Sequence, residues 1–261
     1  MTSERTQGLV FGEVADEFDR IRPGYPADLV KDVLTYTGAH GLDIGLGALE
    51  IGAGTGKATS AFTQHGVAVT AIEPDQAMAA LLAQRLPDVA IELTSFERFV
   101  SAQRFGLLYC AQAWHWTEPS TRWQSASAAL APGGTLALFW NYDRIADDGQ
   151  RAAVREVVAE HAPQLLFEFD DEPAGDQDLA TLWPGTDIVR QPDFADLATH
   201  LYLWERTISA GDYVAYLGTH STFRMLAEPV RDRLFAAIED RLAVPVTLAV
   251  ETVLYLARRT G

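Results

Sequence analysis

The chain has 261 residues, and its 36 acidic and 20 basic side chains give a net charge of −16 with histidine neutral. Hydrophobic residues make up 48% of the sequence, so a sizeable core can form and general disorder is excluded. The acidic surface repels phosphate backbones and argues against a general nucleic-acid-binding protein. The single cysteine, Cys110, can form neither an internal disulfide nor a thiolate zinc site, which fits a reducing cytoplasm.

The sequence predicts neither export nor a membrane span. The first residues contain no apolar stretch of signal-peptide length. The apolar runs elsewhere are far shorter than the roughly 20 residues that cross a bilayer. We therefore expect a soluble, cytoplasmic protein with no membrane partner.

Short apolar runs alternate with helical patterns over much of the first 141 residues, which is typical of a parallel sheet. The predicted strands, apolar enough to be buried on both faces, cover residues 48–52, 67–73, 90–96, 105–111 and 135–141. Helices are predicted between them over 57–65, 75–86 and 120–130. The last of these stops before Pro132-Gly133-Gly134, where proline cannot continue a helix.

The alternation lapses after Asn141. A helix is predicted over 149–161, and the acidic segment 168–178 is interpreted as a solvated loop, because its acids lack EF-hand spacing. Two late apolar runs, 201–209 and 246–257, flank helical segments at 212–217 and 228–242, and we expect the two runs to pair antiparallel.

The predicted fold class is therefore α/β: a doubly wound, Rossmann-like sheet of seven strands with an antiparallel last strand. We expect one domain over residues 1–261. Its core covers about 43–141 and 201–261, and a helical cap is formed by about 1–42 and 142–200.

The strongest chemical signal is the run Glu50-Ile51-Gly52-Ala53-Gly54-Thr55-Gly56 at the end of the first predicted strand. Glycines allow a sharp turn into the next helix and the close approach of a ligand. A dinucleotide site needs G-x-G-x-x-G, but the sixth position from Gly52 is Lys57, which weakens a pyrophosphate interpretation. Glu73, at the tip of the second strand, can accept both hydroxyls of a ribose, as NAD and S-adenosylmethionine both require.

These residues resemble the class I S-adenosylmethionine-dependent methyltransferases. The resemblance covers roughly residues 11–141 and rests on the glycine run and on three further motifs: Ile72-Glu73-Pro74-Asp75, Cys110-Ala111-Gln112-Ala113-Trp114-His115-Trp116 and Leu130-Ala131-Pro132-Gly133-Gly134. The segment 18–26 and the tail resemble a bacterial small-molecule branch that includes trans-aconitate-methyltransferase-like proteins. The resemblance implies S-adenosylmethionine as cofactor and a small-molecule methyl acceptor, and no metal site is predicted.

The resemblance also assigns cofactor-binding residues. It implies that Gly52, Gly54 and Gly56 pack against the amino-acid and ribose parts of the cofactor. Glu73 would hold the ribose hydroxyls, and Glu50 would orient the glycine loop.

The adenine contact has several candidates. Many relatives place an aspartate after the third strand, where this chain has Ser95. Ser95, the backbone of Phe96 and Glu97 are therefore the alternatives, and core packing is the other role open to Phe96. Cys110 opens the segment after the fourth strand and is included among the cofactor-binding candidates.

The implied reaction is an in-line displacement at the sulfonium methyl group, for which positioning and exclusion of water supply much of the rate. A base is needed only if the acceptor nucleophile arrives protonated. His115 is the candidate base, since it lies just beyond the fourth strand, where open α/β sheets place their ligands. The alternative is a local hydrogen bond or helix cap.

Aromatic residues at the ends of the fourth and fifth strands are predicted to wall the methyl-transfer chamber, namely Trp114, Trp116, Trp140 and Tyr142. Core packing is the alternative, and about half of them are expected to touch ligand. In the entry segment, Arg22 offers a guanidinium for a carboxylate and Tyr25 a phenol, unless both anchor the loop between Pro23 and Pro26. His220 is a further substrate candidate, with an ordinary surface histidine as the alternative.

Two other functions stay open. A nicotinamide-dependent oxidoreductase shares the fold and Glu73, but not the glycine spacing. A non-catalytic S-adenosylmethionine-binding regulatory or interaction protein shares every cofactor feature. A nucleic-acid base methyltransferase is disfavoured by the charge and because residues 110–114 lack the usual Asn/Asp-Pro-Pro-aromatic run. The accepting atom and the oligomeric state are left open.

Overall fold

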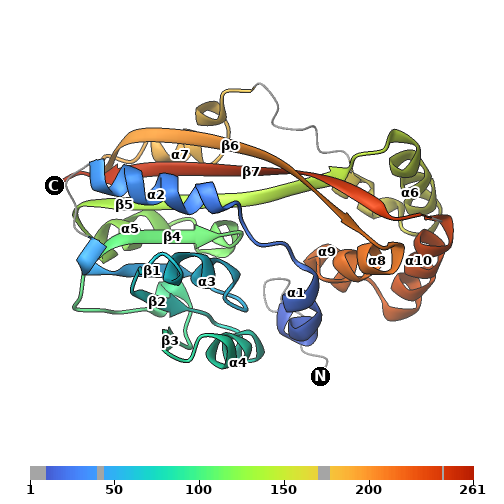
Figure 1. Ribbon diagram of the computed structural model, residues 1–261, viewed down its shortest axis with the longest axis horizontal. Coiled ribbons are helices and arrows are strands. Elements are labelled where there is room, and N and C mark those ends of the chain that lie inside the picture. The colour runs from blue at the N-terminus through green and yellow to red at the C-terminus, as the bar shows by residue number, and fades with distance from the viewer. Residues whose placement is uncertain (1–9, 40–43, 170–176, 243) are drawn as a thin grey trace. The chain divides into compact units, whose positions relative to one another are not determined.

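The computed structural model describes residues 10–39, 44–169, 177–242 and 244–261. It contains a seven-stranded sheet in the order β3-β2-β1-β4-β5-β7-β6 (Figure 1). The strands are β1 (Ala48–Ile51), β2 (Val69–Ile72), β3 (Ala90–Glu92), β4 (Phe105–Ala111), β5 (Leu130–Ile145), β6 (Phe194–Ile208) and β7 (Val246–Arg259).

Strand direction confirms the predicted fold class. The pairs β1–β2, β2–β3, β1–β4 and β4–β5 are parallel. β7 lies between β5 and β6 and runs in the opposite direction to them (Figure 1). The protein is therefore an α/β, Rossmann-like doubly wound fold whose last strand is antiparallel.

The chain divides into two compact units, and β5, β6 and β7 each contribute residues to both. The sheet unit comprises the described residues of Gly24–Asn141, Ala174–Tyr202 and Thr252–Gly261. The helical unit comprises those of Met1–Pro23, Tyr142–Pro173 and Leu203–Glu251. These boundaries differ from the predicted core and cap. Residues 24–39 and 177–200 belong to the sheet unit, whereas 203–251 belong to the helical unit. Most of the predicted acidic loop lies outside the described residues.

The sheet unit has an apolar core on each face of its strands. Alternate residues face opposite sides of a strand, so Leu49 and Leu108 lie in one core while Ala48 and Leu107 lie in the other. Every residue of β1 and β4 is buried. The helices of this unit are α2 (Ala27–Ala39), α3 (Lys57–Thr63), α4 (Gln76–Arg85), α5 (Arg122–Ala129) and α7 (Gly185–Ile188). α2, predicted as part of the cap, packs on the sheet instead through an apolar face that includes Leu29.

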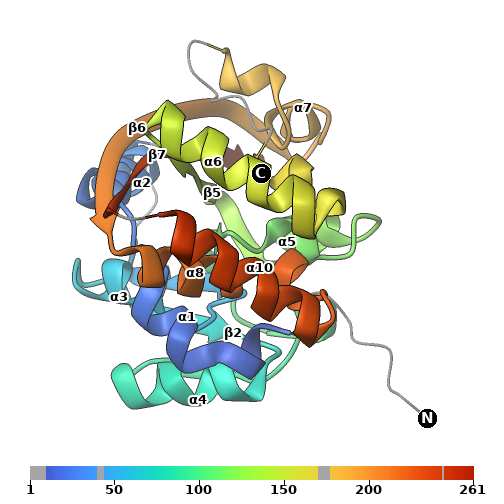
Figure 2. The ribbon, with the colours of Figure 1, turned by 90° about the vertical axis from the view of Figure 1, so that its right-hand side faces the viewer.

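The helical unit has a core of its own. Its helices are α1 (Ala15–Ile21), α6 (Asp148–His161), α8 (Ala210–Gly218), α9 (Ser221–Arg224) and α10 (Glu228–Arg241), three of which, α6, α8 and α10, are prominent in Figure 2. Val158, Tyr213, Phe223 and Ile238 are buried together in this core. The predicted helices at 149–161, 212–217 and 228–242 correspond to α6, α8 and α10.

β5 begins earlier than predicted. The chain enters the strand directly after α5, at Leu130, and the Pro132-Gly133-Gly134 segment forms an irregularity within it. Phe105 pairs with Leu130, and Leu107 pairs with Thr135. Between these two pairs the chain advances five residues along β5 but only two along β4. Gly133 has φ +80°, a value that permits the local bend.

Candidate functional site

The predicted cofactor residues lie in or just after the carboxyl-terminal parts of neighbouring parallel strands, with Glu50 in β1 and Cys110 in β4. β1 pairs with β2 on one side and with β4 on the other, so the connections after β1 and β4 lead to opposite faces of the sheet. Open α/β sheets bind ligands at such a switch point.

The three glycines after β1 have left-handed backbones but different surroundings. Their φ values are +66° for Gly52, +58° for Gly54 and +87° for Gly56. A Cβ on Gly52 would lie 2.5 Å from the Cβ of Ala113, and one on Gly56 would lie 2.3 Å from Cδ1 of Leu82. A Cβ on Gly54 would meet no atom within 4 Å. A side chain on Gly52 would therefore collide with Ala113, and one on Gly56 would displace the end of the Leu82 side chain, whereas the Cβ position of Gly54 is open.

Glu73 ties the glycine loop to the tip of β2. Its Oε2 accepts a hydrogen bond from the backbone N–H of Gly54 at 2.7 Å, and its Oε1 accepts one from the N–H of Asp75 at 2.8 Å. The side chain is only 6% exposed, and burial raises the pKa of Glu73 to about 7 although both hydrogen bonds oppose the shift. Each oxygen keeps a second lone pair, as acceptance of ribose hydroxyls requires.

Glu50 is a buried residue of β1, the strand that leads into the glycine loop, and is 1% exposed. Its Oε2 accepts hydrogen bonds from the hydroxyls of Thr59, at 2.5 Å, and Tyr109, at 2.8 Å. Its Oε1 has no hydrogen-bond partner. Burial raises the pKa of Glu50 to about 8, despite these two bonds. Thr59 and Tyr109 were not predicted. The one signal in the sequence is the phenol of Tyr109 within the apolar run 105–111, because a buried hydroxyl there needs a polar partner such as Glu50.

The candidates after β3 and β4 occupy different environments. Ser95 is half-buried and precedes a short 3-10 helix, Phe96–Arg98. Phe96 is buried and packs on Trp114, with ring centroids 6.2 Å apart. Glu97 is exposed and accepts a hydrogen bond from the N–H of Glu118 at 2.8 Å. Cys110 is fully buried in the core, and burial raises the pKa of its thiol well above the usual range.

The tryptophans near β4 and β5 divide between core and surface. Trp114 and Trp140 are buried, whereas His115 and Trp116 are exposed. Trp140 donates its indole N–H to Nδ1 of His115 at 3.4 Å. A neutral His115 in this arrangement carries its proton on Nε2, so action as a base requires the indole contact to be released. Partial desolvation, followed by the charge of Arg122, lowers the pKa of His115.

Trp183 joins this aromatic group and was not predicted. Its ring is 38% exposed and lies 5.3 Å from that of Trp140, and its N–H donates to Asp187 at 3.1 Å. Asp187 also pairs with the buried Arg122 at 3.5 Å. No sequence signal pointed to Trp183, because it lies more than 60 residues beyond the run 110–116.

Gln112 in that run has φ +61°, an uncommon value for a residue with a side chain.

Tyr25 of the entry segment belongs to the sheet unit. Its ring packs edge-on against Phe139 at a centroid distance of 4.8 Å. The carbonyl of the preceding Gly24 accepts a hydrogen bond from Asn141 Nδ2 at 3.0 Å. These contacts anchor the segment to the part of β5 that pairs with the carboxyl end of β4.

The remaining substrate candidates belong to the helical unit. Arg22 donates to the hydroxyl of Thr219 at 2.7 Å and to its carbonyl at 3.1 Å, and its guanidinium lies 4.9 Å from the centre of the Tyr216 ring. The His220 ring lies 4.7 Å from the same ring, and burial, with a smaller effect of Arg22, lowers its pKa well below the usual value. Tyr142 is exposed.

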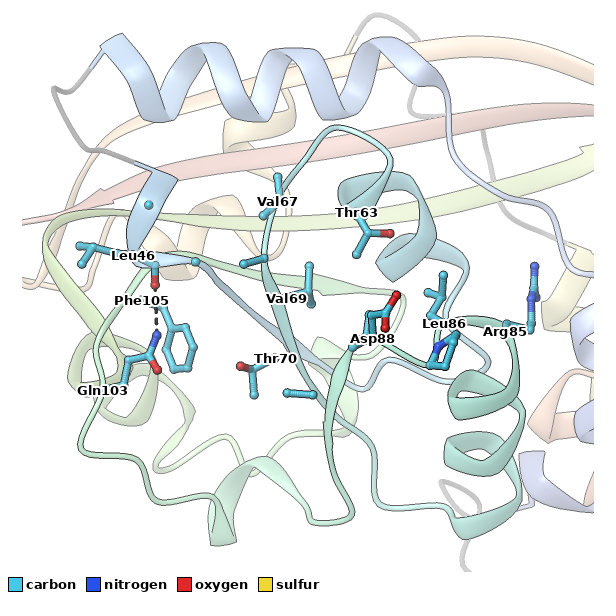
Figure 3. A pocket seen from close by; sticks show the side chains of 16 residues that line it. Leu46, Thr63, Val67, Val69, Thr70, Arg85, Leu86, Asp88, Gln103 and Phe105 are labelled. Carbon is cyan, nitrogen blue, oxygen red and sulfur yellow. Dashed lines mark hydrogen bonds between the residues drawn. The ribbon is translucent and has the colours of Figure 1, made fainter.

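A pocket of about 660 Å³ lies at the amino ends of the strands, not at their carboxyl ends (Figure 3). Its lining includes Gly47, Val69 and Phe105, which lie where β1, β2 and β4 begin, together with Arg85 and Asp88. None of the predicted site residues lines it. The pocket therefore does not coincide with the glycine loop.

The described residues contain no group of three or more His, Cys, Asp or Glu side chains placed to hold a metal ion. No helix within the described ranges is long and apolar enough to cross a membrane.

Comparison with known proteins gives consistent matches. Residues 49–138 match the model of a methyltransferase domain. An uncharacterized methyltransferase of Mycobacterium tuberculosis is 34% identical over 140 residues, which are 53% of this chain and 55% of that protein. A probable S-adenosylmethionine-dependent methyltransferase of Saccharomyces cerevisiae is 26% identical over 135 residues, 48% of this chain and 44% of that protein. The chain thus spans about half the length of the curated relatives it matches.

Solved structures extend the likeness in fold. A structure from Anaeromyxobacter dehalogenans, assigned to the type II methyltransferases, has a TM-score of 0.59 and 20% identity, and the match covers 92% of this chain and 99% of that one. Residues 49–138 are thus similar to a methyltransferase domain, and the chain shares its fold with this solved structure.

Proposed function

We propose that the protein transfers the methyl group of S-adenosylmethionine to a small-molecule acceptor. The observation that carries the proposal is the pairing of Gly54 with Glu73. The glycine loop leaves open space beside its backbone at Gly54. The N–H of Gly54 also donates a hydrogen bond to the buried carboxylate of Glu73 at the tip of β2. The assignment to the trans-aconitate-like branch and the cytoplasmic location stay predictions from the sequence.

The residues present fit the cofactor. Gly54 leaves room for a ligand against the backbone, and Glu73 offers lone pairs for the ribose hydroxyls. Glu50 Oε1 is a buried oxygen that the protein leaves without a partner, and it suits a positively charged amino group. When bound, S-adenosylmethionine supplies a methyl group activated by its sulfonium.

The chain's own residues would promote the methyl transfer mainly by positioning the two reactants and by excluding water from them. His115 is the proposed base for an acceptor that arrives protonated. Its lowered pKa keeps the imidazole neutral near pH 7, and release of the Trp140 contact exposes the Nδ1 lone pair. Trp116 and Trp183 offer exposed aromatic surface for an acceptor.

The net charge of −16 favours a small acceptor over nucleic acid. The test is incubation of the protein with methyl-labelled S-adenosylmethionine and three fractions of a bacterial extract: small molecules, nucleic acid and protein. We expect label to enter the small-molecule fraction, and Gly54→Val to abolish the transfer. Label in the nucleic-acid fraction would contradict the proposal. Cofactor binding without transfer to any fraction would favour the non-catalytic binding protein instead.

A further inference from the structure

Trp183 presents an exposed ring whose position is fixed by three contacts. The ring packs on that of the buried Trp140 at a centroid distance of 5.3 Å. The guanidinium of Arg122 lies over the ring, 5.6 Å from its centre. The indole N–H donates to Oδ2 of Asp187 at 3.1 Å. Part of the Trp183 ring is therefore open to a ligand, while the rest is held by a second ring, a cation and a hydrogen bond.

Asp187 links Trp183 to a buried charge. Its Oδ2 also lies 3.5 Å from Nη2 of the buried Arg122. Within the described ranges, Asp187 is the acid that pairs with this guanidinium. A buried cation needs a counter-charge, so the carboxylate is held at Arg122, and the Trp183 N–H meets an acceptor of fixed position. Arg190 approaches Asp187 at 3.9 Å, but its side chain is exposed and contributes little.

The segment 179–188, which carries this ring, is packed into the core of the sheet unit. Leu179 and Ile188, at its two ends, are buried in that core. At Gly185 the backbone passes so close to the preceding turn that a Cβ would lie 2.8 Å from the carbonyl oxygen of Ala180. The exposed ring therefore stands on a rigid support.

The surroundings of the ring define the ligand that it can accept. Aromatic rings pair favourably with one another when they stack with an offset or meet edge-on. The Arg122 cation already lies over Trp183, so a positively charged ligand on the same ring is disfavoured by like-charge repulsion. The neighbouring Trp140 donates its N–H to Nδ1 of His115, which places the proposed base one residue away from the ring.

We propose that Trp183 contacts the methyl acceptor and selects a flat, uncharged aromatic molecule, and that Asp187 is the positioning residue for its ring. The inference rests on the proposed function, because it assumes a small-molecule acceptor. A hydroxyl on such an aromatic ring arrives protonated near pH 7, which matches a base at His115. Phenol is the simplest probe of this class.

The test is titration of the full chain, labelled with ¹⁵N-tryptophan, with phenol and with cyclohexanol. The two probes carry the same hydroxyl on rings of similar size, but cyclohexanol is not aromatic. Binding is followed at the six indole N–H resonances in NMR spectra, assigned with Trp→Phe variants. We expect phenol to shift the Trp183 resonance saturably and to bind about two- to tenfold more tightly than cyclohexanol. In Trp183→Ala, followed at the Trp140 resonance, phenol binding should weaken by a similar factor.

The positioning role is tested with variants of Asp187. Asp187→Ala should shift the Trp183 resonance of the free protein and weaken phenol binding. Asp187→Asn keeps an oxygen that can accept from the indole and should recover part of the affinity. Asp178→Ala is the matched control, because it lies in the same part of the chain and removes a side-chain bond to the N–H of Ala180. It should keep the wild-type Trp183 resonance and phenol affinity.

Equal binding of phenol and cyclohexanol, or unchanged phenol affinity in Trp183→Ala, would overturn the inference. The proposed function would stand, because transfer of label to the small-molecule fraction does not depend on phenol. Absence of that transfer would overturn both. A wild-type resonance and affinity in Asp187→Ala would reject the positioning role. If Asp187→Ala does not fold, Trp183→Phe replaces it: this variant keeps a ring without the N–H and should bind phenol less tightly than the wild type, and equal binding rejects the role.

Discussion

The glycines after β1 show how one motif serves both packing and binding. Gly52 is hemmed in by Ala113 and Gly56 by Leu82, whereas the Cβ position of Gly54 is open. All three have positive φ, so a side chain at any of them strains the backbone. Only at Gly54 would it also occupy space available to a ligand.

The first prediction separates strain from ligand exclusion. Gly54→Val should abolish binding of S-adenosylhomocysteine in a calorimetric titration. Gly66→Val is the matched control, because Gly66 also has a left-handed backbone, φ +78°, and no atom within 4 Å of its Cβ position, but lies outside the proposed site. It should lose a similar amount of stability and keep its affinity. Equal affinity loss in both variants would remove Gly54 from the site.

The second prediction concerns stability and Glu50. Its folded-state pKa, about 8, lies above the ordinary value of 4.5, so the folded protein holds an extra proton between these pH values. Wild-type stability should therefore fall as the pH rises through this window, by at most about 1.4 kcal/mol per pH unit from this group. Urea unfolding at pH 5.5 and pH 8 should show a smaller decrease for Glu50→Gln. Identical decreases would contradict a buried neutral acid.

The third prediction tests His115. If its imidazole removes a proton from the acceptor, His115→Ala should keep cofactor affinity and lower single-turnover methylation by about 10²–10⁴-fold. Trp140→Phe removes the indole donor to Nδ1 and should retain the base. A His115→Ala protein with the wild-type rate and pH profile would assign the histidine a local structural role.

For several residues the sequence predicted the place along the chain but not whether the side chain is buried. Trp114 lies just beyond β4 as predicted, but Trp140 lies within β5, which continues to Ile145. The burial of both rings depends on which distant segments cover them. Trp114 packs on Phe96 and Trp123, and Trp140 on Trp183 and Tyr255. Such contacts join segments far apart in the chain, and a single sequence does not reveal them.

At the scale of elements, apolar runs located β1 and β4 because a strand buried on both faces must be apolar throughout. The run 90–96 was wrongly predicted to be buried, since β3 covers only Ala90–Glu92 and its two end residues are exposed. β4 matches its predicted bounds, and β1 differs by one residue. The long strands were only partly predicted. β5 continues to Ile145 and β6 begins at Phe194, through segments whose residues are mostly half-buried or exposed and so lack a continuous apolar signal.

The fourth prediction concerns the start of α4. The Asp75 side chain accepts hydrogen bonds from the N–H groups of Ala77 and Met78 and so caps the helix. Asp75→Ala should destabilise the protein by about 0.5–2 kcal/mol in urea unfolding. The N–H of Asp75 that donates to Glu73 is a backbone group and remains, so cofactor affinity should change little.

A matched variant exists in the helical unit. Asp147 caps α6 through the N–H of Gln150, and Asp147→Ala should cost a similar amount. A large loss of cofactor affinity in Asp75→Ala alone would show that the side chain does more than cap the helix.

At the scale of the whole molecule, the sequence predicted the sheet but not the division into two units. Each unit combines three separated stretches of chain, so neither has a contiguous signature. α2 illustrates the reason. Its apolar face, with Leu29 and Val33, indicates that the helix packs on something, but not whether the partner is the sheet or a cap.

The central claim is that S-adenosylmethionine binds at the carboxyl ends of β1 and β2. A crystal structure of the protein with S-adenosylhomocysteine tests it most directly. We predict ligand against the backbone at Gly54, with its ribose hydroxyls on the carboxylate of Glu73. Ligand in the pocket lined by Arg85 and Asp88, or contacts to neither Gly54 nor Glu73, would contradict the account.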